Sequence, residues 1–273
     1  MKTLQHYKNK YRYSAILLKQ LVITDFKLRY KGSFLGYFWT LLKPLALFAV
    51  MYVVFIHFLK FGANEPHFAV ALLLGIVLWT YFVEVTMNGM SAIVGKGDLM
   101  RKLAFPRYVI VVAGSFSAFI NLAINLVVVT ILILINGVVL TPRALLMFPI
   151  IMELFVFALA VAFLLSALYV KLRDMNYVWE LVLQVGFYAT PIFYPVSYIV
   201  AVSLVAAKVV MLNPMAQIIQ DARYALVSDQ TITTWKLLGG GWYVMIPVAI
   251  VVILIVLSGW YFRKASPSFA ERV

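Results

Sequence analysis

The chain has 273 residues, of which 64% are hydrophobic and 12% charged, and its formal net charge is +13. Soluble domains are about 45–50% apolar and about 25% charged, so the composition excludes an ordinary soluble protein and indicates an integral membrane protein. Positive charge is typical of the cytoplasmic loops of such proteins, and we expect no nucleic-acid partner. The chain has no cysteine, which excludes disulfides and thiolate-bound metals.

Six apolar segments follow one another, and each approaches the roughly 20 residues that a helix needs to cross the hydrocarbon core. Their period is helical, without the alternation of membrane β-strands. The sequence therefore predicts an all-α integral membrane protein with a single transmembrane domain over residues 1–273 and a six-span bundle over residues 36–262. The predicted spans are residues 36–59, 68–90, 108–135, 145–169, 176–194 and 243–262.

Residues 14–31 precede the first span and predict an amphipathic helix that lies flat on the cytoplasmic membrane surface. Asp25 interrupts its pattern slightly, and a solvated basic tail is the alternative. The polar face carries Gln20, Thr24, Lys27 and Lys31, and the opposite face carries Leu18, Leu21, Val22 and Leu28.

Residues 196–212 are apolar, but they are short, flanked by proline and interrupted by Lys208. If they crossed the membrane, the basic C-terminus would lie outside, against the tendency of Lys and Arg to remain in the cytoplasm. We therefore expect this segment to be re-entrant or to lie at the outer surface, with both chain termini cytoplasmic. With six spans, the basic residues away from the inner segments are Lys60, Arg143, Lys208, Arg223 and Lys236.

Four polar side chains within the predicted spans are candidates for function: Glu84, Glu180, Asn121 and Asn125. A carboxylate inside the membrane needs a partner or water, so Glu84 and Glu180 either line a wet inner vestibule or take part in transport. Asn121 and Asn125 lie one helical turn apart, which favours hydrogen bonds between helices.

Aromatic side chains gather in the second and fifth predicted spans. Many such rings face lipid or belong to interfacial belts, but a ring with a hydroxyl rim also suits the face of a sugar. The candidate channel-lining aromatics are Trp39, Trp79, Tyr81, Phe82, Phe187, Tyr188, Phe193 and Tyr194.

The loop of residues 95–107 mixes apolar and charged side chains, which indicates a docking surface for another protein; a solvated loop is the alternative. The chain has no phosphate-binding glycine motif of the Gly-x-x-x-x-Gly-Lys-Ser/Thr type, so any ATP must be bound elsewhere. His6, His57 and His67 are scattered and predict no metal site, and no catalytic residue set is recognisable.

Five stretches resemble, in the same order, motifs of the export-type (type-2) ABC-transporter permease family, which moves lipid-linked polysaccharides. The resemblance covers nearly the whole chain. The stretches are RYKGSFLGYFWTLLKPL (29–45), LMRKLAFPR (99–107), LRDMNYVW (172–179), TPIFYP (190–195) and LNPMAQIIQDAR (212–223).

The resemblance implies a homodimer around a central channel, with two separate ATPase subunits that hold ATP and Mg²⁺, and no cofactor in this chain. It implies that residues 196–220 form short helices of an outer gate. It places a polyprenyl pyrophosphate near Lys27, Arg29 and Lys31 at the inner leaflet. The residues implied to contact the ATPase are Asp98, Leu99, Arg101, Lys102 and Arg107.

The function implied is that of the channel-forming subunit of an exporter for a lipid-linked polysaccharide, such as O-antigen or a capsular glycan, across the plasma membrane. A teichoic-acid exporter is an alternative within the same family. Glu84 and Glu180 motivate a more distant alternative, an ion-coupled carrier that works without an ATPase. Two further alternatives are a membrane-embedded enzyme that acts on lipid-linked sugars and a membrane scaffold that transports nothing. The enzyme would need catalytic residues that meet at one depth in the membrane, and the sequence shows none. The scaffold would be distinguished by the lack of substrate-stimulated turnover in the purified complex.

Overall fold

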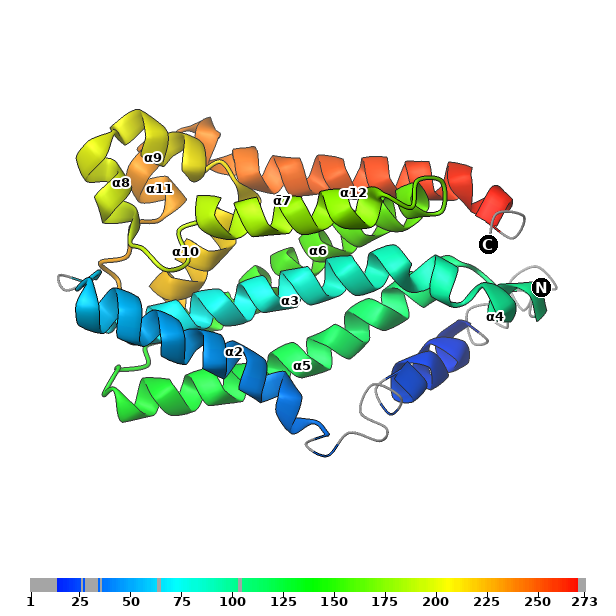
Figure 1. Ribbon diagram of the computed structural model, residues 1–273. Helices are drawn as coiled ribbons and strands as arrows, with labels where there is room; N and C mark the ends of the chain where they lie inside the picture. Colours follow the sequence, from blue (N-terminus) through cyan, green and yellow to red (C-terminus); the bar gives the residue numbers. More distant parts are fainter. Residues whose placement is uncertain are drawn as a thin grey trace.

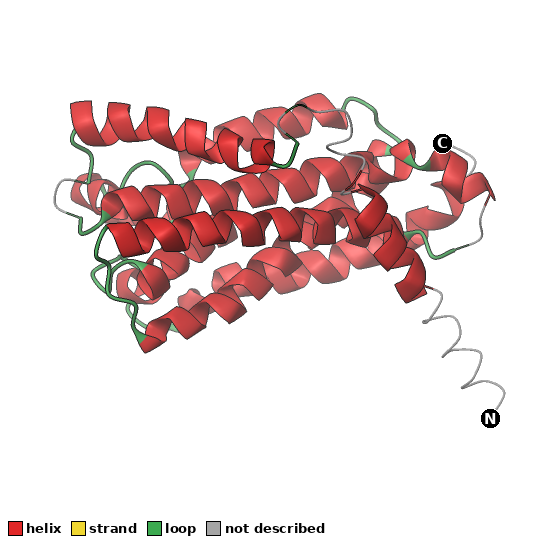
Figure 2. Cartoon of the chain, turned by 90° about the horizontal axis from the view of Figure 1, so that it is seen from below, coloured by secondary structure: helices red, strands yellow, loops and turns green. Residues whose placement is uncertain are grey.

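The computed structural model describes residues 14–25, 27, 34, 36–62, 65–102 and 105–269. All the regular structure in these ranges is helical, which confirms the predicted all-α membrane class, and Figure 2 shows the long helices running side by side. Five helices are long and apolar enough to span a membrane: Phe38–Phe58, Phe68–Gly95, Tyr108–Ile135, Pro142–Tyr169 and Trp242–Ser268.

Short 3₁₀ or π turns extend several of these long helices. Tyr52–Phe58 is a π-helical continuation of α2, and Pro142–Leu146, Trp242–Met245 and Ser266–Ser268 are 3₁₀ turns. The α-helices are α2 (Phe38–Met51), α3 (Phe68–Gly95), α4 (Gly97–Lys102), α5 (Tyr108–Ile135), α6 (Met147–Tyr169), α7 (Met175–Ala189), α8 (Val196–Val202), α9 (Leu204–Val210), α10 (Pro214–Leu226), α11 (Thr234–Leu238) and α12 (Ile246–Ala265).

Helix α3 is the most buried of the five long helices, and it packs between α5 and α6 (Figure 1). On its α6 side the backbones approach closely at Gly89. A Cβ added there would lie 2.5 Å from the Cβ of Ala162, nearer than real Cβ atoms come. Small residues allow such close helix packing in membranes. Helix α12 packs in turn on α6, and most of the buried core comes from α3, α5 and α6.

The fifth predicted span differs from the structure. Helix α7 has 15 residues, or roughly 22 Å at 1.5 Å per residue, which is shorter than the roughly 30 Å hydrocarbon core. It ends because Thr190 precedes Pro191 and takes an extended conformation, as residues before proline do. The sequence prediction ran on to residue 194 because the following turn is also apolar. A count of six crossings stays a prediction.

The segment of residues 196–226 folds into three helices. Helices α8 and α9 have seven residues each, too short to cross a membrane, as the sequence pattern indicates. Asn213 caps α10 by accepting a hydrogen bond from the Met215 backbone amide at 2.9 Å. Figure 1 shows α8, α9 and α11 together at one end of the bundle.

The other end of the bundle is rich in basic side chains, and we call it the basic end. It holds the helix of residues 14–25, α4 and the end of α12 (Figure 1). The loop between α6 and α7 also lies at the basic end, because Lys171 Nζ in this loop is 3.5 Å from the Tyr261 hydroxyl near the end of α12. Lys and Arg accumulate on the cytoplasmic side of membrane proteins, so the predicted orientation makes the basic end cytoplasmic.

Candidate functional site

The exposed stripe of α3 is polar although the helix is otherwise deeply buried. Thr80, Glu84, Asn88 and Ser91 recur every three or four residues, and none of them is buried. Side chains at that spacing share one helical face. A stripe in contact with lipid is expected to be apolar, so a polar stripe indicates water or a polar ligand within the membrane.

Helix α5 presents a matching polar stripe toward α3. The Asn121 side-chain amide donates a hydrogen bond to Glu84 Oε1 at 2.7 Å. The Asn125 amide donates to the Thr40 carbonyl of α2 at 3.3 Å and to the Asn121 carbonyl at 2.9 Å. The two asparagines therefore link α5 to both α3 and α2, and one of them fixes the carboxylate of Glu84.

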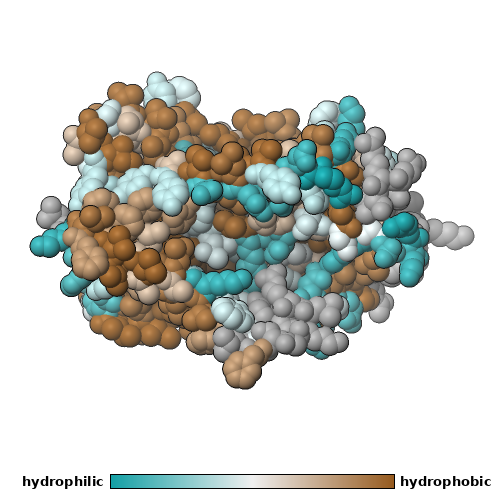
Figure 3. Space-filling model, viewed as in Figure 1, coloured by the Kyte–Doolittle hydropathy of each residue, from teal (hydrophilic) through white to brown (hydrophobic). Residues whose placement is uncertain are grey.

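Two hollows follow this contact, and together we call them the α3–α5 groove. The central pocket has a volume of about 310 Å³, and the basic-end pocket has a volume of about 270 Å³. Asn88 lines both. Figure 3 shows hydrophilic surface in the middle of this face, between hydrophobic regions. The central pocket is further lined by Trp39, Thr40, Lys43, Glu84, Asn121 and Asn125, and the basic-end pocket by Asp25, Ser91, Gly95, Lys96, Gly114 and Ser117.

An ion pair lies at the mouth of the basic-end pocket. Lys96 Nζ lies 2.7 Å and 2.9 Å from the two carboxylate oxygens of Asp25. This pair joins the helix of residues 14–25 to the end of α3. Sequence reasoning missed it and treated Asp25 as an interruption of the amphipathic pattern. The sequence did contain one indication of this pair, because a single carboxylate in a basic amphipathic helix needs a positively charged partner.

Glu180 lies on α7 rather than in the α3–α5 groove. It is exposed, and it accepts a hydrogen bond at 2.9 Å from the Asn176 amide one turn earlier. The two carboxylates that the sequence singled out together therefore have different surroundings. Glu84 pairs with α5, whereas Glu180 pairs within its own helix.

The candidate aromatics divide into buried and exposed rings. Phe82 stacks on Phe157 with centroids 5.1 Å apart, and Trp79 packs edge-on against Phe187 at 6.0 Å. Tyr81 contacts Phe119 on α5 instead. Within the subunit, Trp79, Tyr81 and Phe82 thus pack against protein.

The remaining rings lie nearer the surface. Phe187 and Phe193 stack at 5.8 Å, and Phe193 meets Tyr194 edge-on at 4.9 Å. Tyr188 is 57% exposed, and Trp39 is 41% exposed and lines the central pocket. Contact of any of these rings with a transported polymer stays a prediction.

The sequence model of the ABC-2 type transporter family matches residues 16–227. The chain belongs to this family. It is 28% identical over 263 residues to a Myxococcus xanthus protein named "O-antigen export system permease protein RfbA", covering 96% of this chain and 97% of the relative. Two Klebsiella pneumoniae proteins of the same name are 28% identical over 222 residues, covering 79% of this chain and 83% of each relative.

Membership of the ABC-2 type transporter family implies an ATPase partner, and α4 presents exposed charged side chains at the basic end. Asp98, Arg101 and Lys102 are exposed and Leu99 is partly so, with Asp98 and Arg101 forming an ion pair at 3.4 Å. Arg107 has a different role, since its guanidinium donates to the backbone carbonyl of Ser266 after α12. Four of the five predicted coupling residues therefore share one exposed helix, and the fifth fixes the loop to the C-terminal segment.

Only one of the three residues predicted to meet a pyrophosphate can be located in this ABC-2 type transporter. Lys27 is helical and exposed. Arg29 and Lys31 lie outside the described residues. Among the described residues, no cluster of His, Asp and Glu could hold a metal ion.

Arg223 of α10 is a buried arginine that sequence reasoning did not single out. Only 3% exposed, it donates to the carbonyls of Ala71 at 3.0 Å, Pro191 at 2.9 Å and Ile192 at 2.5 Å. Burial lowers the pKa of Arg223 to about 10, which leaves it charged at neutral pH. It thus joins α3, α10 and the turn after α7.

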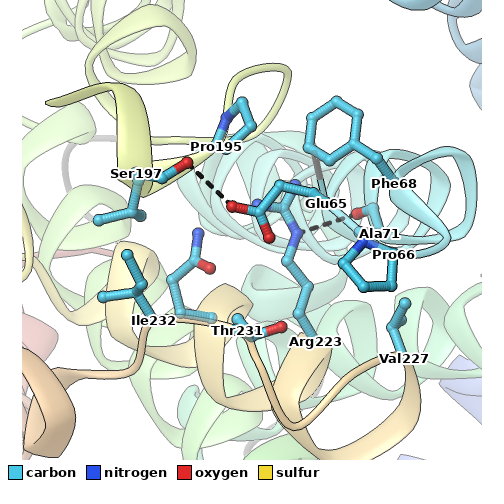
Figure 4. A pocket seen from close by; sticks show the side chains of 12 residues that line it. Glu65, Pro66, Phe68, Ala71, Pro195, Ser197, Arg223, Val227, Thr231 and Ile232 are labelled. Atoms are coloured by element: carbon cyan, nitrogen blue, oxygen red, sulfur yellow. Dashed lines mark hydrogen bonds between the residues drawn. The ribbon is translucent and has the colours of Figure 1, made fainter. Parts of the chain in front are cut away.

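The side chain of Arg223 connects two of the sequence motifs in this ABC-2 type transporter. Arg223 ends one motif and binds the Thr190–Pro195 turn that forms the other. Figure 4 shows Glu65 and Ser197 beside it, with the Ser197 hydroxyl donating to Glu65 at 2.9 Å. Arg223 therefore anchors the chain on both sides of α8 and α9.

Proposed function

We propose that this chain is the transmembrane subunit of an ATP-driven exporter that moves lipid-linked O-antigen polysaccharide across the plasma membrane. The observation that carries the proposal is the similarity to an O-antigen export permease over 96% of this chain. The polar α3–α5 groove supports it, because a polysaccharide needs hydrogen-bonding groups within the membrane.

In the proposed assembly two copies of the chain associate with two ATPase subunits, which bind ATP and Mg²⁺. The chain itself carries out no catalysis. The basic end is cytoplasmic, so both termini lie on that side. The exposed Arg101 and Lys102 of α4 contact the ATPase, since charges at an interface fix its register and its choice of partner.

The connection of α4 to α3 supplies a physical route for coupling. Helix α4 begins at Gly97, and α3 ends at Gly95, so one residue separates them. Helix α3 has 28 residues and is thus roughly 42 Å long. A displacement of α4 by the ATPase therefore moves the end of the helix whose polar stripe lines the groove.

The proposal is tested by purifying the chain with its ATPase in lipid vesicles and measuring ATP hydrolysis and transport with polyprenyl-linked O-antigen. We expect a stable complex that contains two copies of each subunit, and ATP hydrolysis that rises with the glycan. Arg101→Glu should reduce the stimulated turnover about tenfold or more, because it reverses a charge at the proposed interface.

The matched control is Lys208→Glu, which reverses a charge on α9 at the opposite end of the bundle and should leave coupling unchanged. A chain that binds no ATPase and moves solute down an ion gradient would contradict the exporter and favour the ion-coupled carrier.

A further inference from the structure

Three polar side chains meet where α10 packs on α6, and together they have more acceptors than donors. The Gln217 amide nitrogen donates to Asp221 Oδ2 at 2.6 Å and to Glu153 Oε2 at 3.3 Å. The other oxygen of each side chain is buried and accepts no hydrogen bond from any described residue; these atoms are Glu153 Oε1, Gln217 Oε1 and Asp221 Oδ1. Buried polar groups in folded proteins are nearly always hydrogen-bonded, so this cluster lacks a donor.

Gln217 is the most deeply buried member of the cluster. It is 6% exposed, and its side-chain amide points toward both carboxyl groups, to which it donates. A side-chain amide offers two donors and one carbonyl acceptor. Both donors of Gln217 are used on the carboxyl groups, whereas its carbonyl oxygen has no partner among the described residues. A further donor is therefore needed beside this amide.

The two carboxyl groups are close enough to affect each other's charge, since one amide nitrogen contacts both. Asp221 lies on α10, outside the five apolar spans. Burial, together with the nearby charge of Glu153, raises the pKa of Asp221 to about 6, although the hydrogen bond from Gln217 acts in the opposite direction. When two carboxylates share a site, one of them holds its proton more tightly. A protonated carboxyl carries an O–H donor, which is the group that the cluster lacks.

No ion pair joins Glu153 or Asp221 to a described Lys or Arg. The titratable residues of α10 and of the elements that pack on it have other partners or lie elsewhere. They are Arg223, bound to three carbonyls; Arg143, paired with Asp229; Lys236, bound to the Asp229 and Thr231 carbonyls; Tyr224, whose ring faces Arg143 and Lys236; Glu84, bound to Asn121; Tyr81, against Phe119; and Tyr261, Arg263 and Lys264 near the basic end.

A proton fits this cluster better than a metal ion. A cation such as Ca²⁺ takes roughly six to eight oxygen ligands. Here the atom that contacts both carboxyl groups is an amide nitrogen, which donates hydrogen bonds and does not coordinate such a cation. A proton on one carboxyl halves the charge of the pair and also adds the missing donor.

We propose that Glu153, Gln217 and Asp221 form a proton-binding site that holds α10 on α6. In the bound state the two carboxyl groups share one proton. Loss of this proton leaves two like charges across the helix contact, which weakens it. Helices α8 and α9 precede α10 in the chain and α11 follows it, so the site makes the attachment of this end of the bundle depend on pH.

The test uses Asp221→Asn and Glu153→Gln in the complex with the ATPase. Each variant leaves one carboxylate in the cluster, which is the charge of the wild-type pair when it holds its proton. Because the pKa of Asp221 is raised above its usual value, the folded chain binds the proton more tightly than the unfolded chain. The resulting stabilisation is present at low pH and is lost as the pH rises through about 6.

We expect the unfolding temperature of the wild-type complex to fall between about pH 5 and about pH 7, and this fall to be about 2–4 °C smaller in each variant. The ATPase is the same in all complexes, so a difference between variants comes from this chain. The matched control is Asp229→Asn, which removes an exposed carboxyl after the end of α10 and should behave as the wild type.

Infrared difference spectroscopy detects the proton itself, because a protonated carboxyl has a carbonyl band that a carboxylate lacks. Between the same two pH values the wild type and Asp229→Asn should lose intensity in this band. The loss should be smaller in Asp221→Asn and in Glu153→Gln. Neither measurement depends on transport, so a failure of the export proposal would leave both results interpretable.

Three outcomes would overturn the proposal. The first is an equal pH dependence of the wild type and both variants. The second is loss of the carbonyl band at constant pH when Na⁺ or millimolar Ca²⁺ is added, which would assign the cluster to a metal ion. The third is failure of both variants to assemble, because each retains the charge of the proton-bound pair. If only one variant assembles, its pH dependence decides.

Discussion

The two faces of helix α3 differ in how much space lies beside them, and two glycines allow this difference to be tested. Gly89 lies on α3 where it meets α6, and Gly114 lies on α5 beside the basic-end pocket. On the α6 side, Gly89 lets the backbones approach so closely that a Cβ would lie 2.5 Å from that of Ala162. On α5, a Cβ added to Gly114 would meet no heavy atom of the described residues within 4 Å. Gly89 allows α3 and α6 to pack closely, whereas Gly114 lines the basic-end pocket without filling it. Helix α3 packs on both α6 and α5, and the two pockets lie along the α5 side.

The polar groups follow the same division. Toward α6, Phe82 stacks on Phe157 in an apolar contact, whereas toward α5, Glu84 pairs with Asn121 beside an open pocket. A membrane protein gains little from burying apolar surface between helices, since lipid is equally apolar, and close packing supplies the stability instead. Packing on both α6 and α5 thus stabilises the subunit, and the α5 side additionally carries polar groups beside open pockets.

The largest effect should come from filling the closed side. Gly89→Val places a branched side chain against Ala162, and we expect it to destabilise the subunit by about 3 kcal/mol or more through overpacking. Heating the detergent-solubilised complex and measuring the soluble fraction by size-exclusion chromatography checks this. A complex as stable as the wild type would show that α3 and α6 separate easily, and the contrast between the two sides would fail.

Filling the open side should affect transport and not stability. Gly114→Leu occupies the basic-end pocket without a clash, so the unfolding temperature should stay near that of the wild type. Transport of O-antigen should fall about tenfold, equivalent to about 1.4 kcal/mol in the transport barrier. Gly259→Leu adds the same side chain to α12 in open space and should transport normally. Equal transport by the two variants would argue that the basic-end pocket is not used.

Removing the charge within the groove tests whether Glu84 carries protons. Glu84→Gln keeps an oxygen that can accept the hydrogen bond from Asn121, so we expect a loss of stability of about 1 kcal/mol or less. Transport should stay within about threefold of the wild type, with an unchanged pH profile. Asn121→Leu, which removes the donor, should be the more damaging variant. A pH profile altered by Glu84→Gln alone would favour the ion-coupled carrier.

Most of the fold was predictable because long apolar segments of helical period admit few structures in a membrane. The error at α7 arose at Thr190, where the apolar pattern continued but proline ended the helix. The two sides of α3 were partly predictable as well. Trp79 and Phe82 are three residues apart and share a face, whereas Tyr81 lies about 100° from Phe82 around the helix. These rings were nevertheless grouped as one surface.

The pairing of polar groups in the groove was not predictable from the sequence. Glu84 and Asn121 were each recognisable as costly intramembrane polar residues, but their contact depends on the rotation of α3 against α5. Asp25 and Lys96 are 71 positions apart, and only packing brings them together. Arg223 was counted as a basic residue outside the inner segments, because no local pattern shows that it binds three carbonyls.

The smallest effect is expected at the mouth of the groove, where Asp25 and Lys96 form a pair with side chains 26% and 24% exposed. A double-mutant cycle of Asp25→Asn and Lys96→Gln, measured by thermal unfolding, should give a coupling of about 0.2–1 kcal/mol, as for exposed ion pairs. The coupling should shrink in about 0.5 M salt, because screening weakens it. The more exposed Asp98–Arg101 pair is the matched control and should show almost none. If either single variant instead abolished transport at unchanged stability, the ion pair would act on ligand entry, and the open side of α3 would extend to the helix of residues 14–25.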